Sequence, residues 1–323
     1  MAANVVGVDL GATHVRVARV AGNGKLGRVR RGDVGKDPSP EATADLVARL
    51  VSEATGKGSL RAVGIGVAAW IARPSGHVAV APNMGWHDVP FGDLLRARIA
   101  APVRIANDLK AIAWGEYRFG AARGSESMVA VYLGSGIGSG TVVHGVLVEG
   151  ADGFAGEIGH IKVGRNRWLC GCGARGCLEA IAGGHNLSEI LANDARQGNA
   201  PRILQLAGGD VAAIHPGHGD QAASEGDTHA SGLWDEVADT LARGLSALVS
   251  VFNPDRLVLG GSVWHGCPEL RRRTIPLLRE QSVGPSGARV EIVDGALGEL
   301  GGLAGAADLA RRELRRGRIA GGG

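Results

Sequence analysis

The sequence predicts an α/β protein that folds as two lobes. Short apolar strands alternate with amphipathic helices, and glycine turns follow several of the strands. A strand, a glycine loop and a second strand occur in that order twice, at residues 5–20 and again at 128–148. A chain of 323 residues is also longer than one hydrophobic core usually serves, so two related lobes are expected.

The first repeat begins with an apolar strand at residues 5–10 and a turn at 11–13. Residues 14–20 then alternate polar and apolar side chains, as a half-buried strand does. A helix is expected over 39–53, because a proline stands at its start and leucines and valines fall on one face. The next expected elements are a strand at 62–69, a helix at 91–99 and a strand at 103–106.

The second repeat begins with an apolar strand at residues 128–133, a glycine loop and a strand at 140–148. Residues 198–232 show little periodicity, and we expect a mobile loop with some helix there. The remaining expected elements are a helix at 234–252, a strand at 257–259 and a last helix at 302–315. We expect a smaller lobe from 1–110 and 301–318, a larger lobe from 111–300, and a disordered tail at 319–323.

The composition favours a protein with a buried core. Hydrophobic residues make up 45% of the chain and charged residues 21%, which argues against disorder. The net charge of +3 is too small to indicate a nucleic-acid partner, and the arginine-rich end, 311–318, is expected to be a frayed helix end. Asp9 interrupts the first apolar stretch, and no apolar run has the roughly 18 to 20 residues of a membrane span, so we expect a cytoplasmic protein.

Three of the four cysteines lie within eight positions. Cys170, Cys172 and Cys177 are separated by glycines that let the backbone fold around an ion, and His160 stands ten residues upstream. This Cys3His set predicts a tetrahedral zinc site, and its four protein ligands make the zinc structural. A redox cysteine pair or buried free thiols are the alternatives, while a zinc finger would need a second ligand pair and a basic recognition helix. Cys267 stands alone and has no assigned role.

Three glycine turns at strand ends are candidates for phosphate binding. Asp9 precedes the first turn, where backbone N–H groups suit phosphate and the acid suits a metal ion, although a simple hairpin turn is equally consistent. The second turn, residues 134–140, is followed by a strand and therefore does not match a dinucleotide-binding fingerprint. Together with Gly260-Gly261, these turns are consistent with a cage around a polyphosphate group.

Several polar residues are candidates for binding a sugar or for acting on its hydroxyl groups. Asp108, after the strand at 103–106, is placed to take a proton from a hydroxyl, although Asn107-Asp108 also suits a helix N-cap. Glu157 and Glu179 lie beside the expected zinc site and suit sugar hydroxyls, with surface glutamates as the alternative. Asn83 is either a loop cap or a further polar contact.

Taken together, these motifs resemble the ROK family (repressors, open reading frames, kinases), and within it bacterial glucokinases. The resemblance extends from Gly7 to about Ala310. It is carried by Asp9-Leu10-Gly11-Ala12-Thr13, Asn107-Asp108, Leu133-Gly134-Ser135-Gly136-Ile137-Gly138, Gly156-Glu157-Ile158-Gly159-His160, the segment Cys170 to Glu179, and Asn253-Pro254-Asp255 before Gly260-Gly261.

The resemblance implies an actin-like (ribonuclease H-like) two-lobed ATPase fold with Mg-ATP in its cleft, a structural Zn²⁺ and a homodimer. It implies that the protein phosphorylates a hexose, glucose being the first expectation, and that Asp108 is the general base. The sugar contacts would be Asn83, Asn107, Asp108, Glu157, His160 and Glu179. The nucleotide and phosphate contacts would be Asp9, Gly11, Thr13, Gly134, Ser135, Gly136, Gly138, Gly260 and Gly261.

The chain departs from the usual family pattern at several positions. Ala12 and His14 replace Gly and Lys, Ser135 and Ser139 stand where Thr and Gly are usual, and Lys110 replaces a frequent Asn. The alternatives are a kinase for mannose, an N-acetylhexosamine or fructose, a donor other than ATP such as polyphosphate, and a non-catalytic sugar sensor. Repressors of this family carry a helix-turn-helix before the kinase-like body, and eight residues before Asp9 are too few for one.

Overall fold

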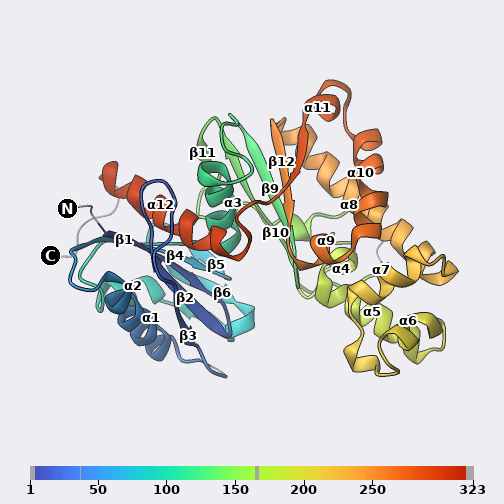
Figure 1. Cartoon of the computed structure of the whole chain (residues 1–323), viewed down its shortest axis with the longest axis horizontal. Helices are drawn as coiled ribbons and strands as arrows, with labels where there is room; N and C mark the ends of the chain where they lie inside the picture. Colours follow the sequence, from blue (N-terminus) through green and yellow to red (C-terminus); the bar gives the residue numbers. More distant parts are fainter. Residues whose placement is uncertain (1–3, 37, 164–166, 318–323) are drawn as a thin grey trace. The chain divides into compact units, whose positions relative to one another are not determined.

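The computed structural model describes residues 4–36, 38–163 and 167–317. The chain forms two compact units (Figure 1). The first comprises the residues up to 126, residues 140–156 and those from 295 onward; the second comprises residues 127–139 and 157–294. The tail expected at 319–323, and residue 318 before it, lie outside the described residues.

The first unit is built on a five-stranded sheet in the order β3-β2-β1-β4-β8. Its strands are β1 (Asn4–Leu10), β2 (His14–Arg19), β3 (Arg30–Asp33), β4 (Leu60–Val67) and β8 (Val103–Asn107). β1, β4 and β8 run parallel, and the register places Leu10, Val67 and Asn107 in one row across the sheet. Asp9, one residue before the end of β1, and Asn107, the last residue of β8, therefore lie near the same edge.

The second five-stranded sheet has the order β11-β10-β9-β12-β13. Its strands are β9 (Met128–Leu133), β10 (Ile137–Val143), β11 (Val146–Leu147), β12 (Arg256–Gly260) and β13 (Glu291–Asp294). In both sheets the third, second, first, fourth and fifth strands follow one another across the sheet, which agrees with the repeat seen in the sequence. The single strand expected at 140–148 is wrong, because a turn at His144 and Gly145, both with positive φ, separates β10 from β11.

A third, antiparallel sheet belongs to the first unit and was not predicted. It consists of β5 (Trp70–Ala72), β6 (His77–Ala81) and β7 (Trp86–Val89), with the short 3-10 helix η1 (Pro82–Met84) between the last two. These strands have only three to five residues. Alternating patterns that short are hard to tell from loop.

In the described part of the first unit, the α-helices that accompany the sheets are α1 (Pro40–Thr55), α2 (Phe91–Arg96), α3 (Asp108–Phe119) and α12 (Gly301–Arg315). The Ser39 hydroxyl caps α1 by accepting from the Ala42 N–H at 3.1 Å. The lobe boundary expected at residue 110 falls inside α3, and all of α3 belongs to the first unit because it packs along α12.

Helix α12 approaches its neighbours so closely that side chains are excluded from the contacts. A Cβ on Gly7 of β1 would overlap the Leu303 carbonyl, and one on Gly64 of β4 would overlap the Ala306 carbonyl. On the α3 side, a Cβ on Gly305 would overlap the carbonyl of Ala111. Glycine is therefore required at these positions for the backbone of α12 to lie directly on β1, β4 and α3.

The second unit is mainly helical around β9, β12 and β13. It contains α4 (Glu179–Ala182), α5 (Gly184–Arg196), α6 (Pro201–Leu206), α7 (Pro216–Ser224), α8 (Thr228–Phe252), α9 (Ser262–Gly266), α10 (Pro268–Gln281) and α11 (Gly284–Arg289). α8 lies at the centre of this core and packs against α7 and α10. None of the helices in the described part of the chain combines the length and the apolar character that crossing a membrane requires.

The mobile loop expected at 198–232 is instead largely helical. It contains α6, α7 and the start of α8, and its buried side chains are small or widely spaced, such as Ile203, Ala222 and Ala223. Asp220, buried in α7, accepts from Trp234 Nε1 at 2.8 Å and from the backbone of α10. A tertiary hydrogen bond of this kind leaves no periodic signal in the sequence.

The packing of α12 predicts that Gly305→Ala destabilises the protein. The added methyl group has to displace either α12 or the Ala111 carbonyl, and we expect the free energy of unfolding to fall by about 2–4 kcal/mol. Gly232→Ala is the matched control, because a Cβ at this glycine in α8 meets nothing within 4 Å. Denaturant unfolding of both variants checks this, and equal stabilities would contradict the close approach.

Candidate functional site

The acidic residues expected to act on the substrate lie at the edge of the first sheet where its parallel strands have their carboxyl ends. Asp9 lies one residue before the end of β1, and Asp108 follows directly after β8 as the first residue of α3. Two strand spacings, about 10 Å, separate β1 from β8, with β4 between them. Gly66 of β4 lets α3 pack closely on the sheet, since a Cβ there would lie 3.3 Å from the Cβ of Ala111 in α3.

Asn107 is the N-cap of α3. Its Oδ1 accepts from the Lys110 N–H at 3.2 Å, and its Nδ2 donates to the Ala69 carbonyl at 3.3 Å. The alternative that a cap explains Asn107 is therefore confirmed, and the cap fixes the position of Asp108. Asp108 Oδ1 accepts from the N–H of Leu109 at 2.9 Å.

The first glycine turn, residues 11–13, joins β1 to β2. The Gly11 N–H donates to the His14 carbonyl at 3.0 Å, so this amide is used within the turn. Thr13 is exposed. Asn83 is also exposed, in η1, within the same unit.

Three of the residues that depart from the family pattern, Ala12, His14 and Lys110, lie in the first unit. Ala12 packs partly against its core, and His14 is exposed at the start of β2. Lys110 is buried, with Nζ donating to the carbonyl of Gly153. This hydrogen bond connects the first turn of α3 to the loop around Gly153.

In the second unit, Glu179 fixes the glycine loop after β9. Its Oε2 accepts from the Ile137 N–H at 2.8 Å, and a Cβ on Gly136 would overlap this oxygen. The N–H groups of Gly184 and His185, at the start of α5, donate to the carbonyls of Gly134 and Ser135. The loop is thus held by α4 and α5, and it leaves Ser135 exposed, with Gly134, Gly136 and Gly138 partly exposed.

Gly260 is the last residue of β12, which pairs with β9, and Gly261 follows it. Gly261 has a φ of +97°, and a Cβ there would overlap the backbone of Leu133 at the end of β9. A Cβ on Gly260 would press on the ring of Tyr132. Only glycine allows β9 and β12 to end this close together, so both expected phosphate loops of the second unit lie at one sheet edge.

The predicted metal ligands come together. One ligand atom from each of His160, Cys170, Cys172 and Cys177 lies within 4.8 Å of the others. Cys172 Sγ is 3.7 Å from Cys177 Sγ, and Cys170 Sγ is 3.6 Å from His160 Nδ1. Tetrahedral zinc, with bonds of about 2.3 Å to sulfur and 2.0 Å to nitrogen, places two sulfurs about 3.8 Å apart and sulfur and nitrogen about 3.5 Å apart. The four side chains therefore fit a zinc ion.

The backbone folds tightly around these ligands. The Cys170 N–H donates to the Ala174 carbonyl at 2.8 Å, and the Gly173 N–H donates to the Cys170 carbonyl at 2.9 Å. Gly173 and Gly176 both have positive φ, which supports the expectation that glycines let the chain turn here. Cys170 and Cys177 are buried, whereas Cys172 is exposed.

The protein environment affects the cysteines differently. Burial raises the pKa of the Cys170 thiol to about 12, whereas the N–H of Ala174 lowers the pKa of Cys172. Lys162 was missed in the sequence: its Nζ lies 2.6 Å from Cys177 Sγ, and this hydrogen bond raises the pKa of the lysine. A lysine two residues after a ligand histidine was the available signal. Lys162 thus places one positive charge against the cysteine cluster.

The three residues expected to contact sugar in this unit flank the cysteine cluster. Glu157 precedes the 3-10 helix η2 (Ile158–His160), which carries His160, and Glu179 begins α4 just after Cys177. Glu179 Oε1 is 3.8 Å from Cys170 Sγ. Glu179 therefore connects the cluster to the glycine loop, a role that the sequence did not reveal.

Two sheets of equivalent strand order, with glycine turns between their first strands and an acid at the edge of the first, place this fold in the actin-like ATPase class. The ROK family model matches residues 5–313, and the chain belongs to the ROK family. It is 34% identical over 315 residues to a glucokinase from Thermotoga maritima, covering 96% of this chain and 98% of that protein.

Solved structures agree with this assignment. The crystal structure of a ROK family glucokinase from Streptomyces griseus in complex with glucose and AMPPNP has a TM-score of 0.78 and 34% identity, covering 96% of this chain and 99% of that one. A ROK hexokinase from Thermus thermophilus has a TM-score of 0.82 and 28% identity, covering 97% and 99%. The expected family and fold class are confirmed.

Proposed function

We propose that this protein, an ATP-dependent hexose kinase of the ROK family, phosphorylates glucose to glucose 6-phosphate with Asp108 as the general base. The observation that carries the proposal is the position of Asp108 at the carboxyl edge of the first sheet, in an element capped by Asn107. The glucokinase relative and the structure with glucose and AMPPNP support glucose and ATP as the substrates.

In the proposed reaction, Asp108 accepts the proton of the sugar 6-hydroxyl as its oxygen attacks the γ-phosphorus of ATP. The bond from that phosphorus to the β,γ-bridging oxygen breaks, and ADP leaves. Positioning supplies much of the rate enhancement in such transfers, so the cap that fixes Asp108 contributes along with its basicity. Asp9, at the same sheet edge, is the residue we propose to help hold Mg²⁺, which neutralises phosphate charge when bound.

The proposed contacts divide between the two units. In the first unit, Asn83 and Asn107 orient the sugar, and Gly11 and Thr13 contact phosphate. In the second, Gly134, Ser135, Gly136 and Gly138 contact phosphate, and Gly260 and Gly261 lie near the adenosine. Glu157 and Glu179 accept hydrogen bonds from sugar hydroxyls, and His160 donates one to a sugar hydroxyl.

We further propose that His160, Cys170, Cys172 and Cys177 hold one structural Zn²⁺. The sulfur–sulfur and sulfur–nitrogen distances support this ligand set. His160 Nδ1 faces Cys170, which leaves Nε2–H free to donate to a sugar hydroxyl. One histidine can therefore serve both as a ligand and as a substrate contact. The homodimer and the cytoplasmic location stay predictions.

Asp108→Asn tests the proposed base. The amide cannot accept the hydroxyl proton, so we expect kcat to fall at least about a hundredfold while glucose still binds. A coupled ADP-release assay and calorimetry with glucose measure the two effects. Asp93→Asn, in the same unit but exposed on α2, is the control. Near-normal turnover of Asp108→Asn would leave this residue with a structural role only.

A panel of sugars tests the substrate. With Mg-ATP, we expect kcat/KM for glucose to exceed that for mannose, fructose and N-acetylglucosamine by at least about tenfold, because a hydrogen-bonded site discriminates strongly against misplaced hydroxyls. A higher value for another sugar would reassign the substrate. Glucose binding without any ADP release would instead identify a sugar sensor.

Cys172→Ala tests the metal. Loss of one ligand from a closed site should release zinc and lower both the melting temperature and the affinity for sugar. Cys267→Ala is the matched control, because Cys267 is a buried free cysteine outside the cluster. Elemental analysis should give one zinc per chain in the unmodified protein and in the control. A zinc-free unmodified protein would refute the proposed site.

A further inference from the structure

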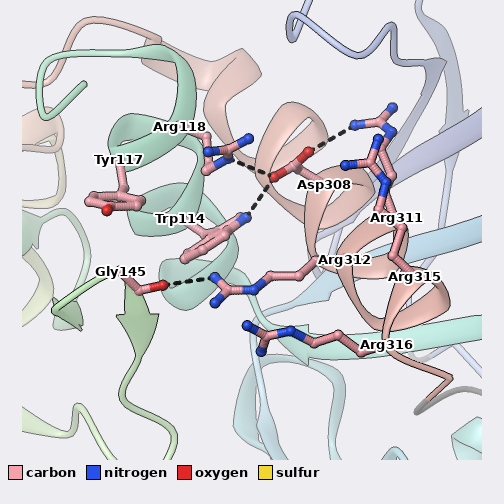
Figure 2. A pocket seen from close by; sticks show the side chains of 9 residues that line it. All are labelled: Trp114, Tyr117, Arg118, Gly145, Asp308, Arg311, Arg312, Arg315 and Arg316. Carbon is pink, nitrogen blue, oxygen red and sulfur yellow. Dashed lines mark hydrogen bonds and ion pairs between the residues drawn. The ribbon is translucent and has the colours of Figure 1, made fainter. Parts of the chain in front are cut away.

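An arginine-rich pocket lies within the first unit, near the C-terminal ends of α3 and α12 (Figure 2). Its volume is about 390 Å³. Three residues come from α3, and one is Gly145 in the turn between β10 and β11. The others come from the C-terminal half of α12 and from Arg316, the residue that follows it. The lining is Trp114, Tyr117, Arg118, Gly145, Asp308, Arg311, Arg312, Arg315 and Arg316.

A single carboxylate organises one side of this pocket. Asp308 is 6% exposed and accepts from three donors, at distances of 3.1 Å from Trp114 Nε1, 3.0 Å from Arg118 Nε and 2.9 Å from an Arg311 nitrogen. Figure 2 shows these side chains converging on it. One negative charge is thus shared between two guanidinium groups, and positive charge remains.

Arg312 is fixed on the other side. It donates to the Gly145 carbonyl at 2.8 Å, and its guanidinium carbon lies 4.7 Å from the centre of the Trp114 ring. Burial lowers the pKa of Arg312, and the nearby charges of Arg316 and Arg118 lower it further. Among the described residues that line the pocket, Asp308 is the one carboxylate, and it bonds to other groups.

Arg315, the last residue of α12, and Arg316, its C-cap, add two more positive charges. Arg315 and Arg316 are exposed, and the described residues provide no hydrogen bond or ion pair to either side chain. Arg311 and Arg315, like Arg312 and Arg316, are four residues apart, so each pair lies on one face of the helix. Like charges at this spacing repel, and an anion between them would relieve the repulsion.

We propose that this pocket binds an anion that carries two or more phosphoryl groups. Five guanidinium groups against one carboxylate call for a ligand with several negative charges, and guanidinium forks match phosphate oxygens in geometry. The volume of about 390 Å³ is larger than one phosphate group needs. Residues 311–315 are helical, in agreement with the helix expected at 302–315, and Arg311, Arg312 and Arg315 line the pocket.

The pocket is separate from the residues proposed for phosphoryl transfer. Asp108 begins α3, and the pocket residues Trp114 to Arg118 follow it by about 9 to 15 Å along the helix. Failure of the kinase proposal would leave the pocket unaffected, and the converse also holds. The competing explanation is that the arginines only complement the negative C-terminal end of α12.

Calorimetric titration of the full-length protein with tripolyphosphate tests the proposal. Glucose and AMPPNP are present throughout, so that the proposed catalytic site is filled, and Mg²⁺ is equal in cell and syringe. At about 0.15 M salt, we expect saturable binding of one tripolyphosphate per chain, at least about tenfold tighter than inorganic phosphate or glucose 6-phosphate. No saturable binding, or equal affinity for a single phosphoryl group, would overturn the proposal.

Arg315→Gln/Arg316→Gln is the test variant. Both side chains are exposed and lie outside the proposed catalytic machinery, so folding and basal turnover should be retained. We expect its affinity for tripolyphosphate to fall at least about tenfold. Arg196→Gln/Arg272→Gln removes the same charge from exposed positions in the second unit and should bind as the unmodified protein does. Unchanged affinity in the test variant, with lowered stability alone, would assign the arginines to helix stabilisation.

Discussion

Direct backbone contact between α12 and the elements around it organises the first unit. Gly7 and Gly64 let the helix lie on the sheet, and Gly305 lets α3 lie along it. Because these contacts involve main-chain atoms, they allow almost no adjustment. They fix β1, which carries Asp9, relative to α3, which starts with Asp108, and they also bring together the two helix ends that form the arginine pocket.

The second unit fixes its loops by polar contacts. The cysteine cluster turns the chain sharply through Gly173 and Gly176, and Glu179 extends from the end of that cluster to the backbone of the loop after β9. The cluster and the glycine loop are therefore one connected structure. We expect a structural change in the cluster to displace the loop through the carboxylate of Glu179.

Much of the fold and of the candidate site was predictable from the sequence. The long helices and buried strands have strong periodicity, and the spacing of the cysteines identified a ligand set that the structure brings together. The short strands at 70–89 and the helices within 198–232 were not predictable, because their side chains are small, few, or held by tertiary hydrogen bonds such as those of Asp220.

The sequence alone determined which residues are chemically able to act: an acid after a buried strand, glycines at strand ends, and three thiols with a histidine. Such residue types and spacings are local properties of the chain. The tertiary structure decided what each residue contacts: that Asn107 caps α3, that Glu179 holds the glycine loop, and that Arg312 on α12 lies over the ring of Trp114 on α3. These contacts join residues distant in sequence, and only packing brings such residues together.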